Sequence, residues 1–188
     1  MAQPQHLKVM NEAIEKHDIA IWNRWRQENP DVRPDLSGSD FVRADLKNAA
    51  LNSVILKEAN LRGTDLSQAD LSRSDLNGAN LVRTHLTSAN LTEADFNKAN
   101  LCEANLSDAN LCEANFSNAN LLGALLHGAD LNKAQLADNV RDLTLFQIKT
   151  ARHWENAYFC EVILEALGLP ADHNEILRNC TEQTNVVK

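Results

Sequence analysis

The sequence predicts an all-β solenoid, and three observations lead to that prediction. An apolar residue recurs at every fifth position from Leu36 to Leu136, 18 times as Leu and three times as Phe. Ala stands two positions earlier in 15 of these 21 units, and the residue between them is Asp or Asn in 16. No unit is interrupted over more than half of the 188-residue chain. Each unit therefore buries its apolar side chains only by stacking on its neighbours.

A five-residue period is incompatible with an amphipathic α-helix. A helix turns by about 100° per residue, so the apolar position would advance by about 140° per unit and wind around the helix. In an extended segment alternate residues share a face, so Ala and Leu point inward and the Asp or Asn between them points outward. The two remaining positions form a bend, and the glycines of the repeat all occupy the second of them: Gly38, Gly63, Gly78, Gly123 and Gly128.

The purest units, such as Ala99-Asn100-Leu101 and Ala104-Asn105-Leu106, resemble the repeat of the pentapeptide repeat proteins, and this resemblance covers residues 34–138. It implies a right-handed quadrilateral β-helix with four units per coil, which gives about five coils for 21 units. Phe96 and Phe116 are four units apart, so the resemblance implies that they stack on one face.

The flanking segments, residues 1–33 and 139–188, are expected to form α-helical caps, because both ends of a solenoid expose unpaired backbone and an open core. Leu7, Met10 and Ile14 follow helical spacing, and Asp18 is expected to begin a second helix that runs to Glu28. The two Trp residues of this flank are expected to pack on the first coil.

In the C-terminal flank we predict helices over Leu145–Arg152 and Trp154–Leu167, followed by a stop at Gly168 and Pro170. A third helix is predicted to start at Asp172. Segments of this flank, for example Leu143–Lys149, are similar to the tail of many bacterial, especially cyanobacterial, pentapeptide repeat proteins.

Departures from the repeat mark candidate interaction sites. Ile55 and Leu125 replace Asp or Asn and should point outward, either beneath a terminal helix or toward a partner. When the first bend position is sorted by face, one side has the most apolar outer stripe, which is either an interface or scattered exposure. We call these residues the stripe: Val42, Arg62, Val82, Cys102 and Leu122.

Cys160 and Cys180 lie at equal distances from the turn at Gly168–Ala171, so an antiparallel helical hairpin would place them at the same height. Either a disulfide joins them, which requires Cα atoms within about 7 Å, or both are buried thiols. Cys102 and Cys112 are two units apart, would lie on opposite faces and cannot pair within one chain.

The sequence contains no motif for catalysis or for a cofactor. The six His and four Cys show no metal-ligand spacing, and neither a phosphate loop nor a nucleophile elbow is present. The net charge of −8 and the lack of a basic patch argue against direct nucleic-acid binding, and no apolar run approaches the roughly 18 residues of a membrane span. We expect a cytoplasmic, non-enzymatic structural or protein-interaction module, monomeric or weakly homodimeric, with a protein partner that the sequence does not identify.

The resemblance also implies an alternative function. Its quinolone-resistance branch comprises acidic rods that resemble duplex DNA and bind DNA gyrase. Here residues 34–138 carry 14 acidic and 8 basic side chains. DNA of similar length, roughly 25 Å, carries about 15 charges of one sign. The charge pattern therefore favours the interaction module over the DNA mimic.

Overall fold

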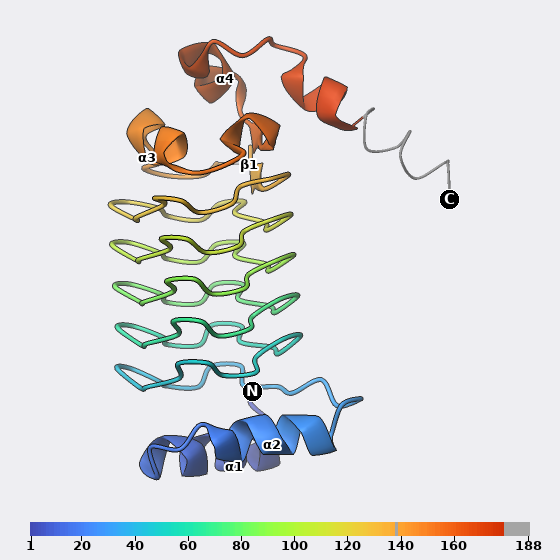
Figure 1. Cartoon of the computed structure of the whole chain (residues 1–188), viewed down its shortest axis with the longest axis vertical. Helices are drawn as coiled ribbons and strands as arrows, with labels where there is room; N and C mark the ends of the chain where they lie inside the picture. The colour runs from blue at the N-terminus through green and yellow to red at the C-terminus, as the bar shows by residue number, and fades with distance from the viewer. Residues whose placement is uncertain (138, 179–188) are drawn as a thin grey trace.

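The repeat forms a β-helical solenoid in a computed structural model that describes residues 1–137 and 139–178 (Figure 1). Parallel bridges join the middle residue of each unit to the residue 20 positions later, from Asp35 with Ile55 to Asn115 with Gln135. Four successive units therefore make one turn of the solenoid, and the fifth unit stacks on the first. The 20-residue period expected from the resemblance is confirmed.

Each unit bends at the same position with the same backbone geometry. The last residue of every unit from 38 to 133 has a positive φ, between 55° and 68°. Each bend is closed by a hydrogen bond across three residues, such as Ala44 N–H to Phe41 O at 3.0 Å, as in type II turns. Only five of these positions are Gly, so residues such as Glu58 adopt the left-handed conformation at some energetic cost.

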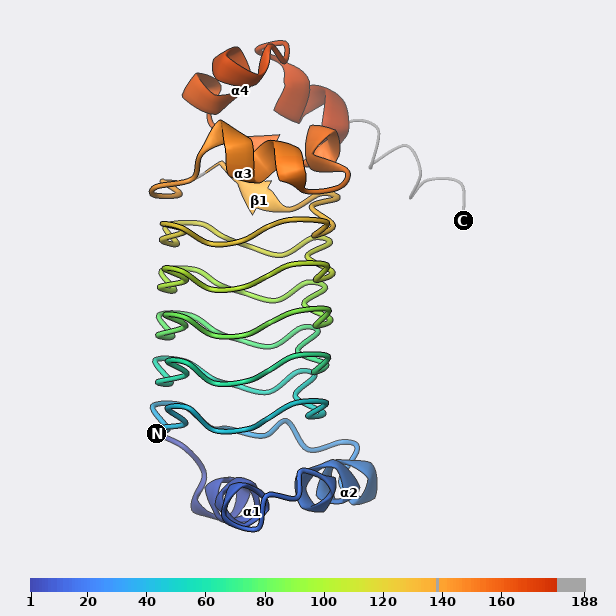
Figure 2. The same cartoon turned by 60° about the vertical axis from the view of Figure 1, so that its left-hand side comes forward.

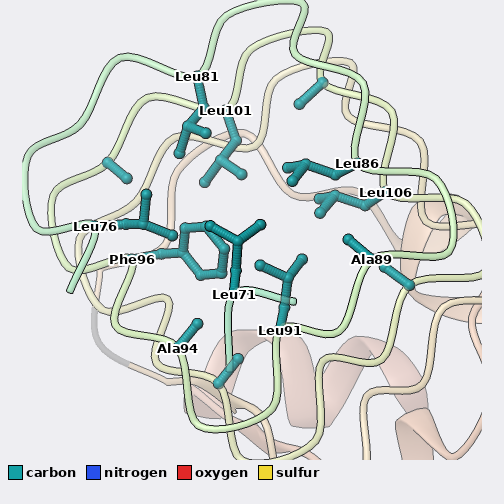
Figure 3. Close-up of a cluster of buried hydrophobic side chains, with 14 of the residues drawn as sticks. Leu71, Leu76, Leu81, Leu86, Ala89, Leu91, Ala94, Phe96, Leu101 and Leu106 are labelled. Atoms are coloured by element: carbon teal, nitrogen blue, oxygen red, sulfur yellow. The ribbon is translucent and has the colours of Figure 1, made fainter. Parts of the chain in front are cut away.

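The core runs along the axis of the solenoid and consists of the inward Leu, Phe and Ala side chains (Figure 3). The Phe96 and Phe116 rings stack with centroids 5.0 Å apart and planes within 5°, so their expected stacking is confirmed. Where Thr replaces Ala, at Thr64 and Thr84, the buried hydroxyl donates to a backbone carbonyl of the preceding turn at 2.7 Å. These two hydroxyls are thus satisfied without breaking the stack, whereas the buried hydroxyls of Ser39 and Ser74, which also replace Ala, have no hydrogen-bond partner among the described residues.

Two helices, α1 (Pro4–Glu15) and α2 (Ala20–Glu28), lie below the first turn (Figure 2). Both were predicted from the periodicity. Asp18 accepts a hydrogen bond from the Ala20 N–H at 3.0 Å. Trp22 is fully buried and its Nε1–H donates to Ala50 O at 2.9 Å, which confirms that it packs on the first turn.

The C-terminal flank contains α3 (Leu145–Thr150), the 3₁₀ helix η1 (Trp154–Asn156), strand β2 (Tyr158–Phe159) and α4 (Glu161–Leu167). Residues 173–178 are also helical, near the predicted third helix. The prediction of one helix over Trp154–Leu167 is wrong. β2 pairs in parallel with β1 (Gln135–Leu136), because the last repeats offer unpaired backbone groups that an extended segment satisfies.

This pairing continues the β-helical stack beyond the repeat. Arg141 bridges to Asn120 and Arg152 bridges to Asp130, so the spacing has widened beyond 20 residues. On the remaining side α3 replaces the strand. The Gln147 side-chain amide donates to Leu121 O and to Ala124 O, each at 2.9 Å. The Ala124 carbonyl is one that a strand above would otherwise bond, as Leu125 N–H bonds Ala104 O one turn below.

Candidate interaction surfaces

The Asp and Asn residues on the outer wall have a structural role. In fifteen units the side-chain Oδ1 accepts a hydrogen bond from the N–H two residues later, at 2.9–3.3 Å. This contact closes an Asx turn at the start of each bend. The sixteenth, Asn60, instead accepts from Asn80 Nδ2 at 3.1 Å, in the turn above. The carboxylates are thus used to order the bends.

The five stripe residues lie in one column. Backbone hydrogen bonds join successive turns beside it, such as Gly63 N–H to Val82 O and Glu103 N–H to Leu122 O. The column is not a continuous apolar surface, because Arg62 is exposed within it and Val82 is half-buried. Its two ends, Val42 and Leu122, are 41% and 54% exposed.

The two outward exceptions differ in their surroundings. Ile55 is half-buried in a column between Asp35 and Asp75, with which it forms bridges. Leu125 is 55% exposed, so the interpretation that a terminal helix covers it is wrong. Helix α3 continues the stack above this side, held by Gln147 and by the Gly128 N–H bond to Thr150 O, but it leaves the Leu125 side chain open.

An apolar residue that sequence reasoning missed extends this surface. Phe146 belongs to α3 and is 78% exposed, although its neighbours Gln147 and Ile148 are buried. Because Gln147 of α3 bonds Leu121 O and Ala124 O, α3 sits on the segment that carries Leu122 and Leu125, and all three exposed residues belong to the C-terminal end. We call Leu122, Leu125 and Phe146 the C-terminal apolar patch. Its only sequence signal was an aromatic residue next to the Thr144–Gln147 capping box.

The charged side chains of the wall pair across turns. Arg73 binds Glu93 at 3.1 Å and Arg83 binds Glu103 at 2.7 Å, each pair 20 residues apart. The hydrogen bond and charge of Arg83 lower the pKa of Glu103, although burial slightly opposes this effect. Such exposed pairs contribute little stability. They do interleave positive charge among the carboxylates.

Cys112, Asp130 and His153 form a polar group near the C-terminal end. His153 Nδ1 lies 2.9 Å from Asp130 Oδ1, and the Cys112 thiol hydrogen-bonds the same carboxylate. Burial, the charge of Asp130 and this hydrogen bond raise the pKa of Cys112. A thiol with a raised pKa is a poor nucleophile, so this group does not have the arrangement of a cysteine enzyme.

Within residues 1–137 and 139–178, no group of three His, Cys, Asp or Glu side chains is placed to hold a metal ion. In the same residues no helix has the length and apolarity needed to cross a membrane. Cys160 is half-buried at the N-terminus of α4. Its predicted partner Cys180 lies outside the described residues, so the disulfide stays a prediction.

Comparison with known proteins identifies the repeat. The family model described as pentapeptide repeats matches residues 35–68, 69–108 and 104–138. A search among curated proteins gave no match. A solved structure of a pentapeptide repeat protein from the Arabidopsis thaliana thylakoid lumen is 34% identical, with 62% of this chain and 76% of that chain covered and a TM-score of 0.37.

Two further structures are similar. HetL from the cyanobacterium Nostoc sp. strain PCC 7120, involved in heterocyst differentiation regulation, is 37% identical over 55% of each chain, with a TM-score of 0.27. The plasmid-mediated fluoroquinolone resistance protein QnrB1 is 16% identical over 73% of this chain and 83% of its own, with a TM-score of 0.34. Because the family model covers residues 35 to 138, more than half of the sequence, the chain belongs to the pentapeptide repeat family, whose fold is the right-handed β-helix.

Proposed function

We propose that this chain is a four-sided β-helical rod of about five coils, with helices at both ends, that acts as a non-enzymatic protein-interaction module. The C-terminal apolar patch is its partner surface. The single observation that carries this proposal is the 78% exposure of Phe146 on α3, the helix that is bonded to the segment with the exposed Leu122 and Leu125.

The energetics of the patch suit protein binding. Full burial of a Phe or Leu side chain contributes about 1.5–3 kcal/mol, and aromatic residues are frequent binding hot spots. The patch is supported by a rigid element, because Ile148 anchors α3 in the core while Gln147 bonds two carbonyls of the last full turn. A preorganised surface loses little conformational entropy on binding.

The DNA-mimic alternative, with DNA gyrase as the partner, has less support. Arg73 and Arg83 neutralise carboxylates on the wall, as does Lys133 with Glu113 at 3.6 Å. A DNA mimic needs a dense array of unpaired negative charge. A gyrase supercoiling assay tests this alternative, and inhibition at micromolar protein would favour it over the interaction module.

The experiment for the interaction module is a quantitative pull-down from cells of the source organism with the wild-type chain and Phe146→Asp. A charge in the centre of the patch should reduce partner recovery at least tenfold. Leu122→Asp should have the same direction of effect. Val162→Asp is the matched control, because Val162 is 75% exposed but lies on α4, outside the patch. Equal recovery by the wild type and both patch variants would refute the proposed surface.

A further inference from the structure

The first turn of the β-helix has no turn below it to complete its hydrogen bonds. On each side of the turns above, three backbone groups point toward the turn below and form hydrogen bonds with it. On one side, Asn60 N–H donates to Ser39 O at 2.9 Å, Asn60 O accepts from Phe41 N–H at 2.8 Å, and Arg62 O accepts from Arg43 N–H at 3.0 Å. The equivalent groups of the first turn need other partners.

On the side that contains Asp35, the N-terminal segment supplies all three. Asp35 N–H donates to His6 Nδ1 at 3.2 Å. Asp35 O accepts from Gln3 N–H at 2.9 Å, and Ser37 O accepts from Ala2 N–H at 3.0 Å. This side is closed by the backbone before α1 and by one side chain of α1.

On the side that contains Ala50, side chains of α2 supply all three. Ala50 N–H donates to Asn23 Oδ1 at 2.8 Å, and Ala50 O accepts from Trp22 Nε1–H at 2.9 Å. Asn52 O accepts from Arg26 Nη2–H at 3.1 Å. This second side is closed as well.

The two sides between them are open. In the part of the chain that the structure describes, the N–H and C=O of Asp40 and of Asp45 have no hydrogen-bond partner, nor do the carbonyls of Val42 and Lys47. Ala44 is also only partly buried, whereas the inward Ala residues of the turns above are fully buried. The first turn therefore presents an unpaired β-edge over residues 40–47, which we call the open edge.

A cleft of about 380 Å³ lies directly against the open edge. Residues 40–45 line one wall, and the C-terminal end of α1 lines the other through Ile14 and Glu15. The cleft is large enough for a few residues of extended chain. Helix α1 thus passes beneath the solenoid without filling the place of a strand on these two sides.

We propose that the open edge binds an extended segment of a partner protein by β-strand addition. Each of the two open sides has three unpaired backbone groups, and an added segment that bends at the corner between them, as the repeat itself does at Arg43, would complete all six hydrogen bonds. This site is distinct from the C-terminal apolar patch and lies at the opposite end of the molecule. We commit to a different protein as the occupant, because among the described residues a second copy offers only its own open edge, which faces its own α1, and its repeat strands are already paired.

The cleft also selects the side chains of the segment. Ile14 and Ala44, which are only partly buried, offer apolar contact to an inward residue. Glu15, Asp40 and Asp45 add three carboxylates that form no ion pair among the described residues, whereas Arg43, with its Cγ against Gly63 of the turn above, is the one Lys or Arg that lines the cleft. The segment that fits alternates apolar and basic residues.

Backbone amide exchange measured by NMR tests this proposal, with an acetylated, amidated peptide of alternating Lys and Val, six residues long, as the probe. In the free protein the Asp40 and Asp45 amides should exchange at least tenfold faster than those of Asp35 and Ala50. Saturating peptide should slow the exchange at Asp40 and Asp45 at least tenfold. The same peptide with alternate backbone amides N-methylated keeps its side chains but loses the edge bonds, so it should bind at least tenfold more weakly.

Several results would overturn the proposal: slow exchange of both amides in the free protein, no binding at millimolar peptide, or equal binding of the N-methylated peptide. Asp40→Pro removes an N–H that has no partner in the free chain, and it should weaken the peptide without loss of the fold. Asp40→Ala keeps that N–H and, like Pro, lacks the Oδ1 that accepts from the Val42 N–H, so it is the matched control. If Asp40→Pro failed to fold, the exchange measurements on the wild type would still decide the question.

Discussion

At the scale of single residues, each position of the unit has one physical task. The Leu position fills the core, the Ala position leaves room for the opposite wall, and the Asp or Asn oxygen fixes the N–H of the bend. This division explains why carboxylates and amides alternate freely on the wall, since either can supply the accepting oxygen. The sequence predicted the inward and outward positions correctly because they follow from local periodicity alone.

The contribution of the Asx hydrogen bond to the free energy of unfolding can be measured. Asn105→Ala removes the 3.0 Å bond from Ser107 N–H to Asn105 Oδ1 and should lower the free energy of unfolding by about 1 kcal/mol. Asn105→Asp keeps the accepting oxygen and serves as the control. Urea denaturation followed by circular dichroism measures both, and an Ala variant as stable as wild type would show that the bend forms without this contact.

Asp130 should make the stability of the protein depend on pH, and the direction of its pKa shift defines the sign of that dependence. Burial raises its pKa, but hydrogen bonds from His153 and from the Asn132 N–H, together with the charge of His153, outweigh burial and hold the pKa below the usual 3.8. Below pH 3.8 the unfolded chain therefore binds more protons at this group than the folded chain. The stability that Asp130 contributes is present above pH 3.8 and is lost as the pH falls through the folded pKa.

The free-energy difference between wild type and Asp130→Asn should accordingly shrink as the pH falls below 3.8. Thermal unfolding of both proteins across this range measures the difference. A difference that does not change with pH would mean that the carboxylate and the neutral amide are equivalent at this site.

At the scale of elements, the C-terminal flank shows tertiary context overriding helix periodicity. The segment Trp154–Leu167 has helical spacing, yet Tyr158 and Phe159 are extended because they pair with Gln135 and Leu136. The upper edge of β2 is then closed by a side chain: Asn174 Oδ1 accepts from Phe159 N–H at 3.1 Å, and Asn174 Nδ2 donates to Phe159 O at 2.6 Å. The Asn amide thus makes the two bonds that a further strand would make.

Substitutions of Asn174 should destabilise the C-terminal end according to how many of its two hydrogen bonds they remove. Asn174→Ala loses both bonds and should lower the free energy of unfolding by about 1–3 kcal/mol, because a buried backbone group left unpaired is costly. Asn174→Asp keeps only the acceptor and should fall between Ala and wild type. Amide exchange at Phe159 is the direct measurement, and unchanged exchange in the Ala variant would contradict the edge-closing role of Asn174.

At the scale of the whole molecule, the two ends differ in how completely their backbone edges are satisfied. At the N-terminal end α1 and α2 close the Asp35 and Ala50 sides and leave residues 40–47 open. At the C-terminal end β2, α3 and Asn174 satisfy backbone groups, but Phe146 remains exposed. The two proposed binding sites therefore lie at opposite ends of the rod and rely on different forces: backbone hydrogen bonds at one end and apolar burial at the other.

A disulfide between Cys160 and Cys180 would join α4 to the segment after residue 178. Intact mass spectrometry of the unreduced protein, with and without alkylation under denaturing conditions, tests this prediction. A disulfide leaves two of the four Cys residues unmodified, whereas four alkylated residues would establish that both are thiols. Cys102 should be alkylated in either case, because it is a free thiol in the part of the chain that the structure describes.

The sequence by itself determined the solenoid, its inward Leu and Ala positions, its bends and the helices before the repeat, because a five-residue pattern carries all of this information locally. Only the tertiary structure decided which sides of the first turn remain open, where Phe146 lies, and that Tyr158 and Phe159 form a strand. These features depend on which backbone groups at the ends of the stack lack a partner. That condition arises from contacts between segments distant in the sequence, so no local pattern encodes it.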